Sequence, residues 1–379
     1  MTPDTNSISL GAQCSPNQAN QIQRSMNKNN ISATVFITTP LETKFVDRIK
    51  SVRPEQVTVL YDPDLLPPTR YTCDHNGIEG FTLTPIQEKR WKTHMAVADI
   101  LWNFPPKTRD GTRGLDFAPN IKWIQTTSSG ISTRIEELNL INSDVLITNS
   151  RGVHAGPLAE FVFLVLLSHV KQLPRMQSDQ KGRHWERFCS NELAGQTLAL
   201  IGMGELGRKI ASIGKIFDMK IVALASPGSE KTAQELGIQK LFPNEQLHTM
   251  LSETDALVLA VPHTPETDGM IDENALRTLK KGSVFINIAR GHIVDESALV
   301  RHLKLGRIAF AGLDTLTIEP LPKDSSLWDL PNVLISPHSA STVKAENERI
   351  TEIFCHNLLC YLEGREEDMR NIVNKRLMY

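Results

Sequence analysis

The sequence has no excess of charge of one sign. Lys and Arg number 41, and Asp and Glu 43, among 379 residues, which gives a formal net charge of −2 at pH 7. Proteins that bind nucleic acid usually present a clustered basic surface, whereas charges of both signs are mixed throughout this chain. We therefore expect no nucleic-acid partner. The length exceeds that of one typical domain and predicts two domains, each with its own core.

Cysteine pairs are also absent. The cysteines are odd in number and form no Cys-x-x-Cys motif, which argues against a disulfide framework and favours a reducing compartment. We expect a cytoplasmic protein, and we predict no metal site. The last two cysteines lie on a helical pattern and are interpreted as packing residues. The five cysteines are Cys14, Cys73, Cys189, Cys355 and Cys360.

Long hydrophobic runs are absent as well. The best candidate, residues 158–170, is shorter than the ~20 residues that a membrane span needs, and Glu160 and His169 interrupt it. Residues 155–172 are apolar on nearly all sides, which predicts a helix buried on more than one face. We expect this helix to join two domains and to meet a second subunit, and we expect no membrane partner.

Residues 1–30 are rich in Asn, Gln and Ser and lack the charged start and apolar core of a secretory signal. We predict that they form a disordered tail. The patterns of a folded protein begin near residue 31.

From there the chain alternates between strand and helix patterns. Several strand segments are runs of Val, Ile and Leu without polar alternation, as in parallel sheets covered by helices on both faces. The fold class is therefore α/β with two doubly wound parallel sheets. A last helix, over 343–363, ends at Gly364 and can return to complete the first domain, which would make that domain discontinuous in sequence. The predicted strands are 34–38, 57–61, 98–102, 121–126, 145–148, 197–201, 220–224, 256–261, 283–288, 308–312 and 332–336.

The most informative segment is a glycine turn, Gly202-Met203-Gly204-Glu205-Leu206-Gly207. It follows the apolar run 197–201 and precedes a helix-like run, which is the context of a dinucleotide-binding loop rather than of an ordinary tight turn. Gly202 allows the turn, Gly204 lets the backbone approach a pyrophosphate, and Gly207 lets the helix pack close to the strand. Unpaired N–H groups at the helix start would face the phosphates.

Reactive side chains follow the last three predicted strands: Arg290, Asp314, Glu319 and His338. Ligands of open parallel sheets bind beyond the carboxyl ends of the strands, so these side chains can line one crevice. Taken singly, the arginine could be a solvated turn residue, the glutamate a loop acid and the histidine a surface residue. Their occurrence at successive strand ends favours a catalytic cluster.

Longer stretches carry a family resemblance. They are 118–130 (APNIKWIQTTSSG), 192–204 (ELAGQTLALIGMG), 264–267 (TPET), 281–291 (KGSVFINIARG) and 327–333 (LWDLPNV). With these stretches, and with the intervals that separate Arg290, Asp314 and Glu319, the chain from about residue 35 to 373 resembles the D-isomer-specific 2-hydroxyacid dehydrogenase family.

The resemblance implies a flavodoxin-like substrate domain into which a Rossmann cofactor domain is inserted, with catalysis in the cleft between them. It also implies a homodimer built largely on the cofactor domains. We expect the substrate domain to comprise residues 31–149 and 340–379 and the dinucleotide-binding domain to comprise 150–339. The residues expected to bind the cofactor are Gly202, Met203, Gly204, Glu205, Leu206, Gly207, Ala225, Ser226, Val261, Pro262, Thr267, Ile288, Ala289, Arg290, Asp314, His338 and Ala340.

The resemblance also implies roles for the cluster. Arg290 would hold the substrate carboxylate and keto oxygen, because a guanidinium offers a planar fork of donors. His338 would act as acid in ketone reduction and as base in alcohol oxidation, and Glu319 would pair with it and favour the imidazolium. Asp314 would contact the nicotinamide end of the cofactor. The residues expected to contact the substrate are Trp102, Ser129, Gly130 and Arg290, with backbone N–H groups around Ser129 and Gly130 assisting the arginine.

One position departs from the family pattern. The predicted strand 220–224 should be followed by an acidic residue that accepts hydrogen bonds from the adenosine ribose of NAD. The chain has Ala225 and Ser226 there, with no arginine for a 2′-phosphate, although Lys231 follows. We expect NAD(P) as the cofactor and favour NADP.

The loop 101–105 lies where this family contacts the variable end of its substrate. It is aromatic and uncharged, although Lys107 and Arg109 follow it, and it favours a small 2-keto acid such as glyoxylate or hydroxypyruvate over a phosphorylated substrate. Phosphite oxidation and a corepressor-like NAD(P)-binding module use the same residues and remain alternatives. Formate dehydrogenases are disfavoured, because they carry glutamine where this chain has Glu319.

Overall fold

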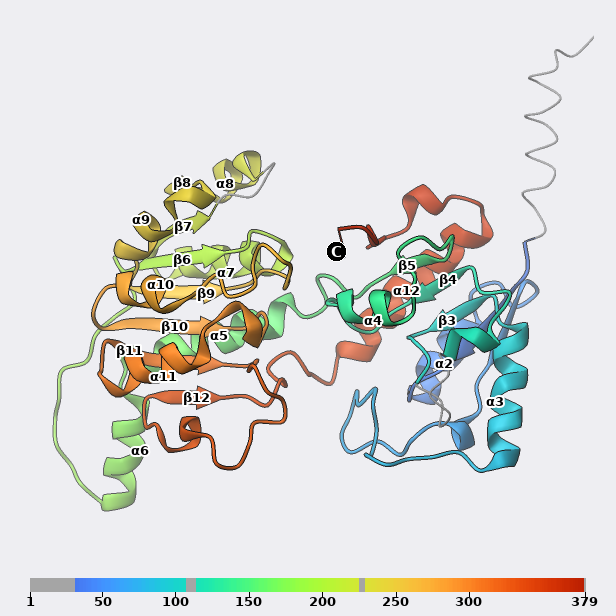
Figure 1. Ribbon diagram of the computed structural model, residues 1–379, viewed down its shortest axis with the longest axis horizontal. Coiled ribbons are helices and arrows are strands. Elements are labelled where there is room, and N and C mark those ends of the chain that lie inside the picture. Colours follow the sequence, from blue (N-terminus) through green and yellow to red (C-terminus); the bar gives the residue numbers. More distant parts are fainter. Residues whose placement is uncertain (1–30, 107–113, 225–228, 378–379) are drawn as a thin grey trace, which may run out of the picture. The chain divides into compact units, whose positions relative to one another are not determined.

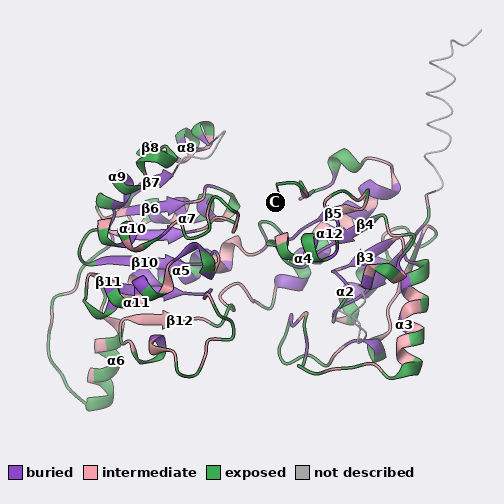
Figure 2. Ribbon diagram, in the orientation of Figure 1, coloured by how far each residue is buried: buried purple, intermediate pink, exposed green. Residues whose placement is uncertain are grey.

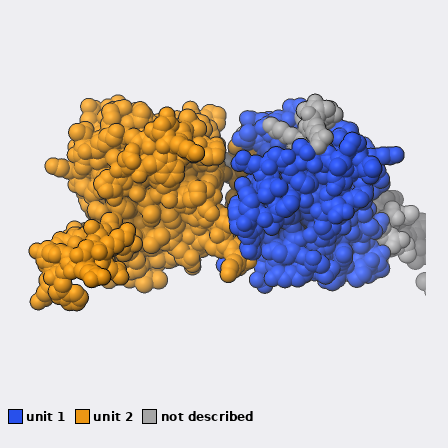
Figure 3. All heavy atoms as spheres, turned by 90° about the horizontal axis from the view of Figure 1, so that it is seen from below, with its two compact units in different colours: residues 1–127, 133–149, 347–376 blue, residues 128–132, 150–346, 377–379 orange. Residues whose placement is uncertain are grey.

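A computed structural model describes residues 31–106, 114–224 and 229–377. The predicted tail and the positions Ala225 and Ser226 lie outside the described residues. The chain forms two compact units, which have different colours in Figure 3. Unit 1 runs to Thr127 and also contains Thr133–Asn149 and Asn347–Arg376, whereas unit 2 contains Ser128–Ser132, Ser150–Glu346 and the residues from Leu377. This division differs from the predicted boundaries in three places: residues 128–132 belong to unit 2, the chain returns to unit 1 at 347 rather than at 340, and the residues from Leu377 belong to unit 2.

Unit 1 contains a five-stranded parallel sheet with the order β2-β1-β3-β4-β5, which is the order of flavodoxin-like folds. Figure 2 shows that most of its strand residues are buried, as expected for a sheet with helices on both faces. Its strands are β1 (Ala33–Ile37), β2 (Val57–Leu60), β3 (Ile100–Trp102), β4 (Trp123–Gln125) and β5 (Leu146–Thr148). Its helices are α2 (Thr43–Lys50), α3 (Pro85–Val97), α4 (Ser132–Glu137) and α12 (Glu346–Leu362), with short 3-10 turns at Pro63–Leu65, Gly114–Phe117 and Glu366–Asp368.

Aromatic residues join α12 to the sheet of unit 1. The ring of Phe354 lies 5.4 Å from that of Trp102 and 5.0 Å from that of Trp123, measured between centroids. Such rings bury large apolar areas and dominate the energetics of a core. The Trp102 side chain is 0% exposed, so the prediction that it contacts the substrate is corrected. Its indole belongs to the core of unit 1.

The end of the chain lies along the edge strand β5. The Val373 N–H donates to the Ile147 carbonyl (2.9 Å), and the Asn149 N–H donates to the Asn371 carbonyl (3.1 Å), in antiparallel register. The Lys375 ammonium donates to the Val145 carbonyl (3.0 Å), and burial lowers its pKa. An open sheet edge invites pairing with another chain, and this C-terminal segment covers the edge of β5.

Unit 2 contains a seven-stranded parallel sheet with the order β12-β11-β10-β9-β6-β7-β8, which is the doubly wound order of Rossmann folds with one added strand. The predicted fold class is thus confirmed for both sheets. The strands are β6 (Thr197–Ile201), β7 (Lys220–Leu224), β8 (Lys240–Phe242), β9 (Ala256–Leu259), β10 (Ser283–Asn287), β11 (Ile308–Leu313) and β12 (Val333–Ile335). The helices are α5 (Ala155–Val170), α6 (Leu173–Gly182), α7 (Glu205–Ile216), α8 (Glu230–Leu236), α9 (Leu247–Ser252), α10 (Glu273–Thr278) and α11 (Glu296–Lys304), with 3-10 turns at Asn244–Gln246, Gly291–Ile293 and Ser326–Asp329.

Helix α5 packs on the sheet of unit 2 and on α7. Val162 and Val165 are fully buried, and a Cβ at Gly312 would overlap the Val165 side chain, so glycine in β11 permits the close approach. The prediction of a buried helix is confirmed, and the whole of α5 lies in unit 2. No single helix among the described residues is long and apolar enough to cross a membrane, and α5 with α6 passes that test only as a pair bent by 61°.

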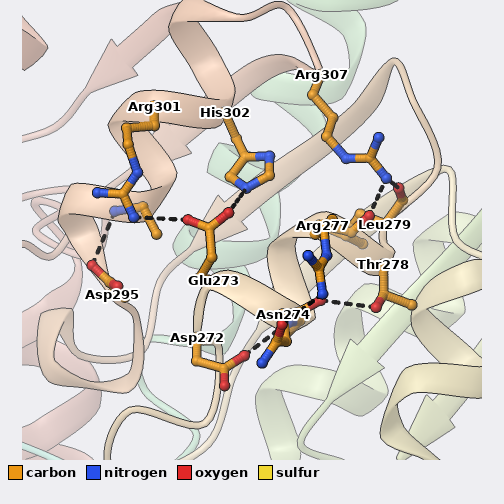
Figure 4. Close-up of polar contacts among 12 residues, drawn as sticks. Asp272, Glu273, Asn274, Arg277, Thr278, Leu279, Asp295, Arg301, His302 and Arg307 are labelled. Carbon is orange, nitrogen blue, oxygen red and sulfur yellow. Dashed lines mark hydrogen bonds and ion pairs between the residues drawn. The ribbon is translucent and has the colours of Figure 1, made fainter.

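Helices α10 and α11 are tied together by one carboxylate. Glu273 accepts from Arg301 (2.7 Å) and lies 2.9 Å from Nε2 of the buried His302, as Figure 4 shows. These partners hold the pKa of Glu273 below its usual value. Both helices begin with an aspartate N-cap, Asp272 and Asp295, which accepts from a first-turn N–H group and stabilises the helix by about 1 kcal/mol.

Candidate active site

The glycine turn between β6 and α7 fits a bound phosphate. Gly202 has φ of +110°, and a Cβ there or at Gly207 would overlap backbone atoms, so the local fold requires both glycines. A Cβ at Gly204 would meet nothing within 4 Å. Gly204 is also the N-cap of α7 and supplies no side-chain cap, so the first-turn N–H groups border open space. This is the arrangement that binds anions at helix N-termini.

The other residues predicted to bind the cofactor lie mainly at carboxyl ends of strands in unit 2. Thr267 donates to the Pro262 carbonyl (2.8 Å) and accepts from the Thr264 N–H (2.8 Å), which shapes the loop after β9. Ile288 and Ala289 are buried directly after β10. Met203 is buried, Glu205 and Leu206 begin α7, and Val261 precedes Pro262.

A histidine–glutamate pair follows β11 and β12. Nδ1 of His338 lies 2.8 Å from Oε2 of Glu319, and both side chains are partly open to solvent. The other Glu319 oxygen accepts from the Leu316 N–H (2.9 Å). An ionised carboxylate can only accept a hydrogen bond, so Nδ1 of the histidine carries a proton. Nε2 is then the ring nitrogen left for chemistry.

Asp314 holds the turn that carries His338. Its Oδ1 accepts from the Ser336 hydroxyl (2.7 Å) and from the N–H groups of Ser339 and Ala340 (both 2.9 Å), and its carbonyl accepts from the His338 N–H (2.9 Å). His338 has φ of +52°, a left-handed conformation that is uncommon for residues other than glycine. Asp314 as a whole is 3% exposed. Sequence reasoning found Asp314 but missed this bracing role and missed Ser336, which stands in the same Ser-Pro-His segment.

Arg290 is held by the loop that follows β10. One guanidinium nitrogen donates to the Ala289 carbonyl (2.7 Å). The buried Asn287 donates to the Arg290 carbonyl and accepts from the Ala289 N–H (both 3.0 Å). Burial lowers the pKa of Arg290, and the charges of Glu319 and Asp314 act in the opposite direction. Because an arginine titrates far above neutral pH, it stays cationic. Asn287 was missed from the sequence, although it ends the same strand.

Glycines bring two further loops close to this arginine. A Cβ at Gly130 would overlap Nη2 of Arg290 and would lie 3.1 Å from its Cζ, so the backbone of residue 130 lies against the guanidinium. A Cβ at Gly291 would overlap the Leu316 carbonyl, which brings the arginine loop against the loop leading to Glu319. The predicted residues Arg290, Asp314, Glu319, His338, Ser129 and Gly130 all lie in unit 2.

The arrangement can bind an anion and move a proton. Arg290 supplies a planar cation, the helix start at Gly204 supplies unpaired N–H groups, and His338 supplies a ring nitrogen backed by a carboxylate. These groups stand at the carboxyl ends of parallel strands of one sheet, β6, β10, β11 and β12, where doubly wound folds bind their ligands.

Comparisons with known proteins identify the family of this chain. Residues 163–340 match the family model described as "D-isomer specific 2-hydroxyacid dehydrogenase, NAD binding domain". The chain is 31% identical over 267 residues to a glyoxylate reductase of Korarchaeum cryptofilum, covering 69% of this chain and 78% of that relative. It is 32% identical over 273 residues to a glyoxylate reductase of Thermofilum pendens, with 70% and 78% covered.

The fold agrees with solved structures as well. A crystal structure of a D-isomer specific 2-hydroxyacid dehydrogenase family protein from Aeromonas salmonicida matches with a TM-score of 0.72 at 24% identity, covering 91% of this chain and 99% of that chain. With the Rossmann order, the glycine turn and the relatives taken together, the chain belongs to the D-isomer specific 2-hydroxyacid dehydrogenase family.

Proposed function

We propose that this protein reduces a small 2-keto acid, with glyoxylate as the first candidate, to the corresponding 2-hydroxy acid. As a family member it is an NAD(P)-dependent oxidoreductase. The observation that carries the proposal is the His338–Glu319 pair (2.8 Å) in the same unit as the partly buried Arg290. The names of relatives that are 30–32% identical support the choice of glyoxylate.

Arg290 would bind the substrate. Its guanidinium presents parallel N–H donors to a carboxylate and to the adjacent keto oxygen, which a point charge cannot do. The backbone of Gly130 lies against the guanidinium, so N–H groups of residues 129 and 130 can share the same carboxylate. Partial desolvation of the arginine strengthens this interaction, because electrostatic attraction grows as water is excluded.

His338 would handle the proton. Nε2 of the imidazolium gives a proton to the carbonyl oxygen as that oxygen gains charge, and the ring is left neutral until solvent protonates it again. In alcohol oxidation the same nitrogen accepts the proton. Glu319 fixes the orientation of the ring through Nδ1. A bound nicotinamide cofactor supplies or accepts the hydride.

The residues that would hold the cofactor include the turn 202–207, Thr267 and Asp314. We favour NADP, because Ala225 stands where an acidic residue would accept hydrogen bonds from the ribose of NAD. Lys231 lies on α8, its side chain is exposed, and it is 4.0 Å from Glu235. It is the first basic residue after position 225 in the sequence, and its ammonium could pair with a 2′-phosphate. A higher kcat/KM with NADPH than with NADH is expected, and a clear preference for NADH would contradict this choice.

We also propose a cytoplasmic homodimer built on unit 2. Helix α6 and the segment after it extend away from the sheet of that unit (Figure 1). Trp185 in this segment is 96% exposed, and Met176 on α6 is exposed too. Apolar side chains gathered on a projecting arm are typical of an interface with another copy. A Trp185→Ser variant is expected to raise the fraction of monomer measured by light scattering. An unchanged fraction of dimer would show that this arm is not part of the dimer interface.

The central experiment is a panel of 2-keto acids assayed by nicotinamide absorbance with both reduced cofactors. Glyoxylate and hydroxypyruvate are expected to be turned over, and a phosphorylated keto acid is not. A separate assay with phosphite and the oxidised cofactors tests the alternative of phosphite oxidation. Cofactor binding without turnover of any substrate would refute the proposed reaction. Since Trp102 is buried in the core, the expectation of a small substrate now rests on the relatives and not on that side chain.

A further inference from the structure

Three segments at which the chain passes between its two units are joined by one chain of polar side chains. The Ser129 hydroxyl lies 3.3 Å from Nδ1 of His154, and Nε2 of the same ring lies 3.3 Å from Oε1 of Glu346. Ser129 stands in the five-residue stretch Ser128–Ser132, His154 follows the passage at Ser150, and Glu346 is the last residue before the return at Asn347. All three side chains belong to unit 2.

The members of this chain differ in how firmly they are held. His154 is the N-cap residue of α5, and its carbonyl accepts from the Leu158 N–H (3.1 Å), so a helix buried in the core of unit 2 fixes its position. Glu346 begins α12 and is buried. Ser129 is exposed on a loop, and a loop residue keeps conformational freedom unless a contact removes it. We therefore regard His154 as the fixed partner, which restrains the loop through its hydrogen bond with Ser129.

The anchored loop is the one that touches the arginine. Gly130 is the neighbour of Ser129, and its backbone lies against the guanidinium of Arg290. The Ser150 N–H donates to the Ser128 carbonyl (3.3 Å) on the other side of the serine. The ionised glutamate accepts from Nε2–H of the ring, so in the neutral ring Nδ1 accepts from the Ser129 hydroxyl.

We propose that His154, oriented by Glu346, is a positioning residue that holds Ser129 and Gly130 against Arg290 and thereby sets the affinity for the substrate carboxylate. This inference rests on the proposed function, because it needs a substrate anion at Arg290. The histidine touches neither the substrate nor the reacting atoms. Its loss is expected to weaken anion binding while the His338–Glu319 pair still transfers the proton.

The test compares His154→Leu with His154→Gln in the full chain. The leucine variant loses both contacts, and we expect about a tenfold rise in KM for glyoxylate and in the inhibition constant of oxamate, an unreactive analogue, as for loss of a hydrogen bond to a charged group. We expect kcat to change by less than about threefold and the dissociation constant of NADPH to be unchanged. The glutamine amide offers an acceptor and a donor of similar reach, so this variant should recover most of the affinity.

A second comparison separates positioning from folding. Ser129→Ala should raise KM as His154→Leu does, and the double variant should be no worse than either, because members of one network are not additive. His302→Leu is the matched control, since His302 is also a histidine bonded to a glutamate in unit 2 (Figure 4). It should lower the melting temperature without raising KM.

The outcomes distinguish the two proposals. A wild-type protein that turns over no 2-keto acid refutes the proposed function. The positioning role is overturned if the wild type is active but His154→Leu leaves KM and the inhibition constant of oxamate unchanged. A lower melting temperature of this variant without any change in KM has the same meaning. Additive effects of Ser129→Ala and His154→Leu would overturn the connection between the two residues.

Discussion

A methyl group at position 130 would overlap the Arg290 guanidinium. In the Gly130→Ala variant the new carbon would meet Nη2 directly and would lie 3.1 Å from Cζ, closer than ordinary contacts of 3.4–4 Å. Either the loop or the guanidinium must therefore move. The guanidinium is the less free of the two to move, because it also donates to the Ala289 carbonyl (2.7 Å) and would have to turn about that bond.

The size of the effect follows from this displacement. A misplacement of about 1 Å in a group that orients the substrate can lower the rate by about 10²-fold. We expect kcat/KM for glyoxylate to fall by about that factor in Gly130→Ala, with NADPH affinity unchanged, because the glycine turn at 202–207 is untouched. The measurements are steady-state kinetics, fluorescence titration with NADPH and a thermal melt.

The control is Gly156→Ala. A Cβ at Gly156 would meet nothing within 4 Å, and this glycine lies in α5, where alanine is the better helix former by about 1 kcal/mol. Its kinetics should match those of the wild type. If Gly130→Ala retained kcat/KM within about threefold of the wild type, the close packing of residue 130 on the arginine would have no part in substrate binding.

Three other changes test the remaining parts of the site and of unit 2. His338→Gln should lower kcat by about 10²- to 10⁴-fold with cofactor binding retained, and near-normal turnover would remove the histidine from the proton step. Asp314→Ala should destabilise the fold by about 2–4 kcal/mol, because three donors lose a buried acceptor, whereas Asp314→Asn keeps an oxygen and should lose less in urea titration; equal losses would contradict the bracing role. The pKa of Glu273 is lowered on folding by Arg301 and His302, so its contribution is present above the unfolded pKa of about 4.3 and is lost as pH falls through the folded value. The melting temperatures of wild type and Glu273→Gln should therefore differ at pH 7 and converge in acid, and a difference that persisted at the lowest pH would mean that the carboxylate charge is not the cause.

Much of the fold could be predicted from the sequence, because buried parallel strands have uninterrupted runs of apolar residues. β6 and β7 were predicted with the bounds that the structure shows. The strand that was missed, β8, has three residues, Lys240–Phe242, of which only Phe242 is buried, so it carries too little apolar pattern to be seen.

The candidate site was less accessible, because side-chain direction is set by packing and not by local pattern. Trp102 ends a strand beside the expected substrate loop, yet Phe354, more than 250 residues later, draws it into the core of unit 1. The hydrogen bonds from Ser129 to His154 and from His154 to Glu346 join positions far apart in sequence. No sequence motif links these three residues, so their contact could not be predicted. Asn287 and Ser336 were missed for a related reason. Asn287 bonds the backbone of the loop that follows it, and Ser336 bonds the Asp314 carboxylate, roles that any short polar residue could fill.

The discontinuity of unit 1 sets an order for its folding during synthesis. Residues 150–346 of unit 2 are contiguous and carry a complete seven-stranded sheet, so that sheet can form as soon as β12 has left the ribosome. The five strands of unit 1 are made first, but Trp102 and Trp123 have no Phe354 to cover them, and β5 has an open edge, until residues 347–376 arrive. The half of the protein that is translated first is therefore the last to be finished, and in the interval its exposed indoles and bare strand are what a chaperone would recognise.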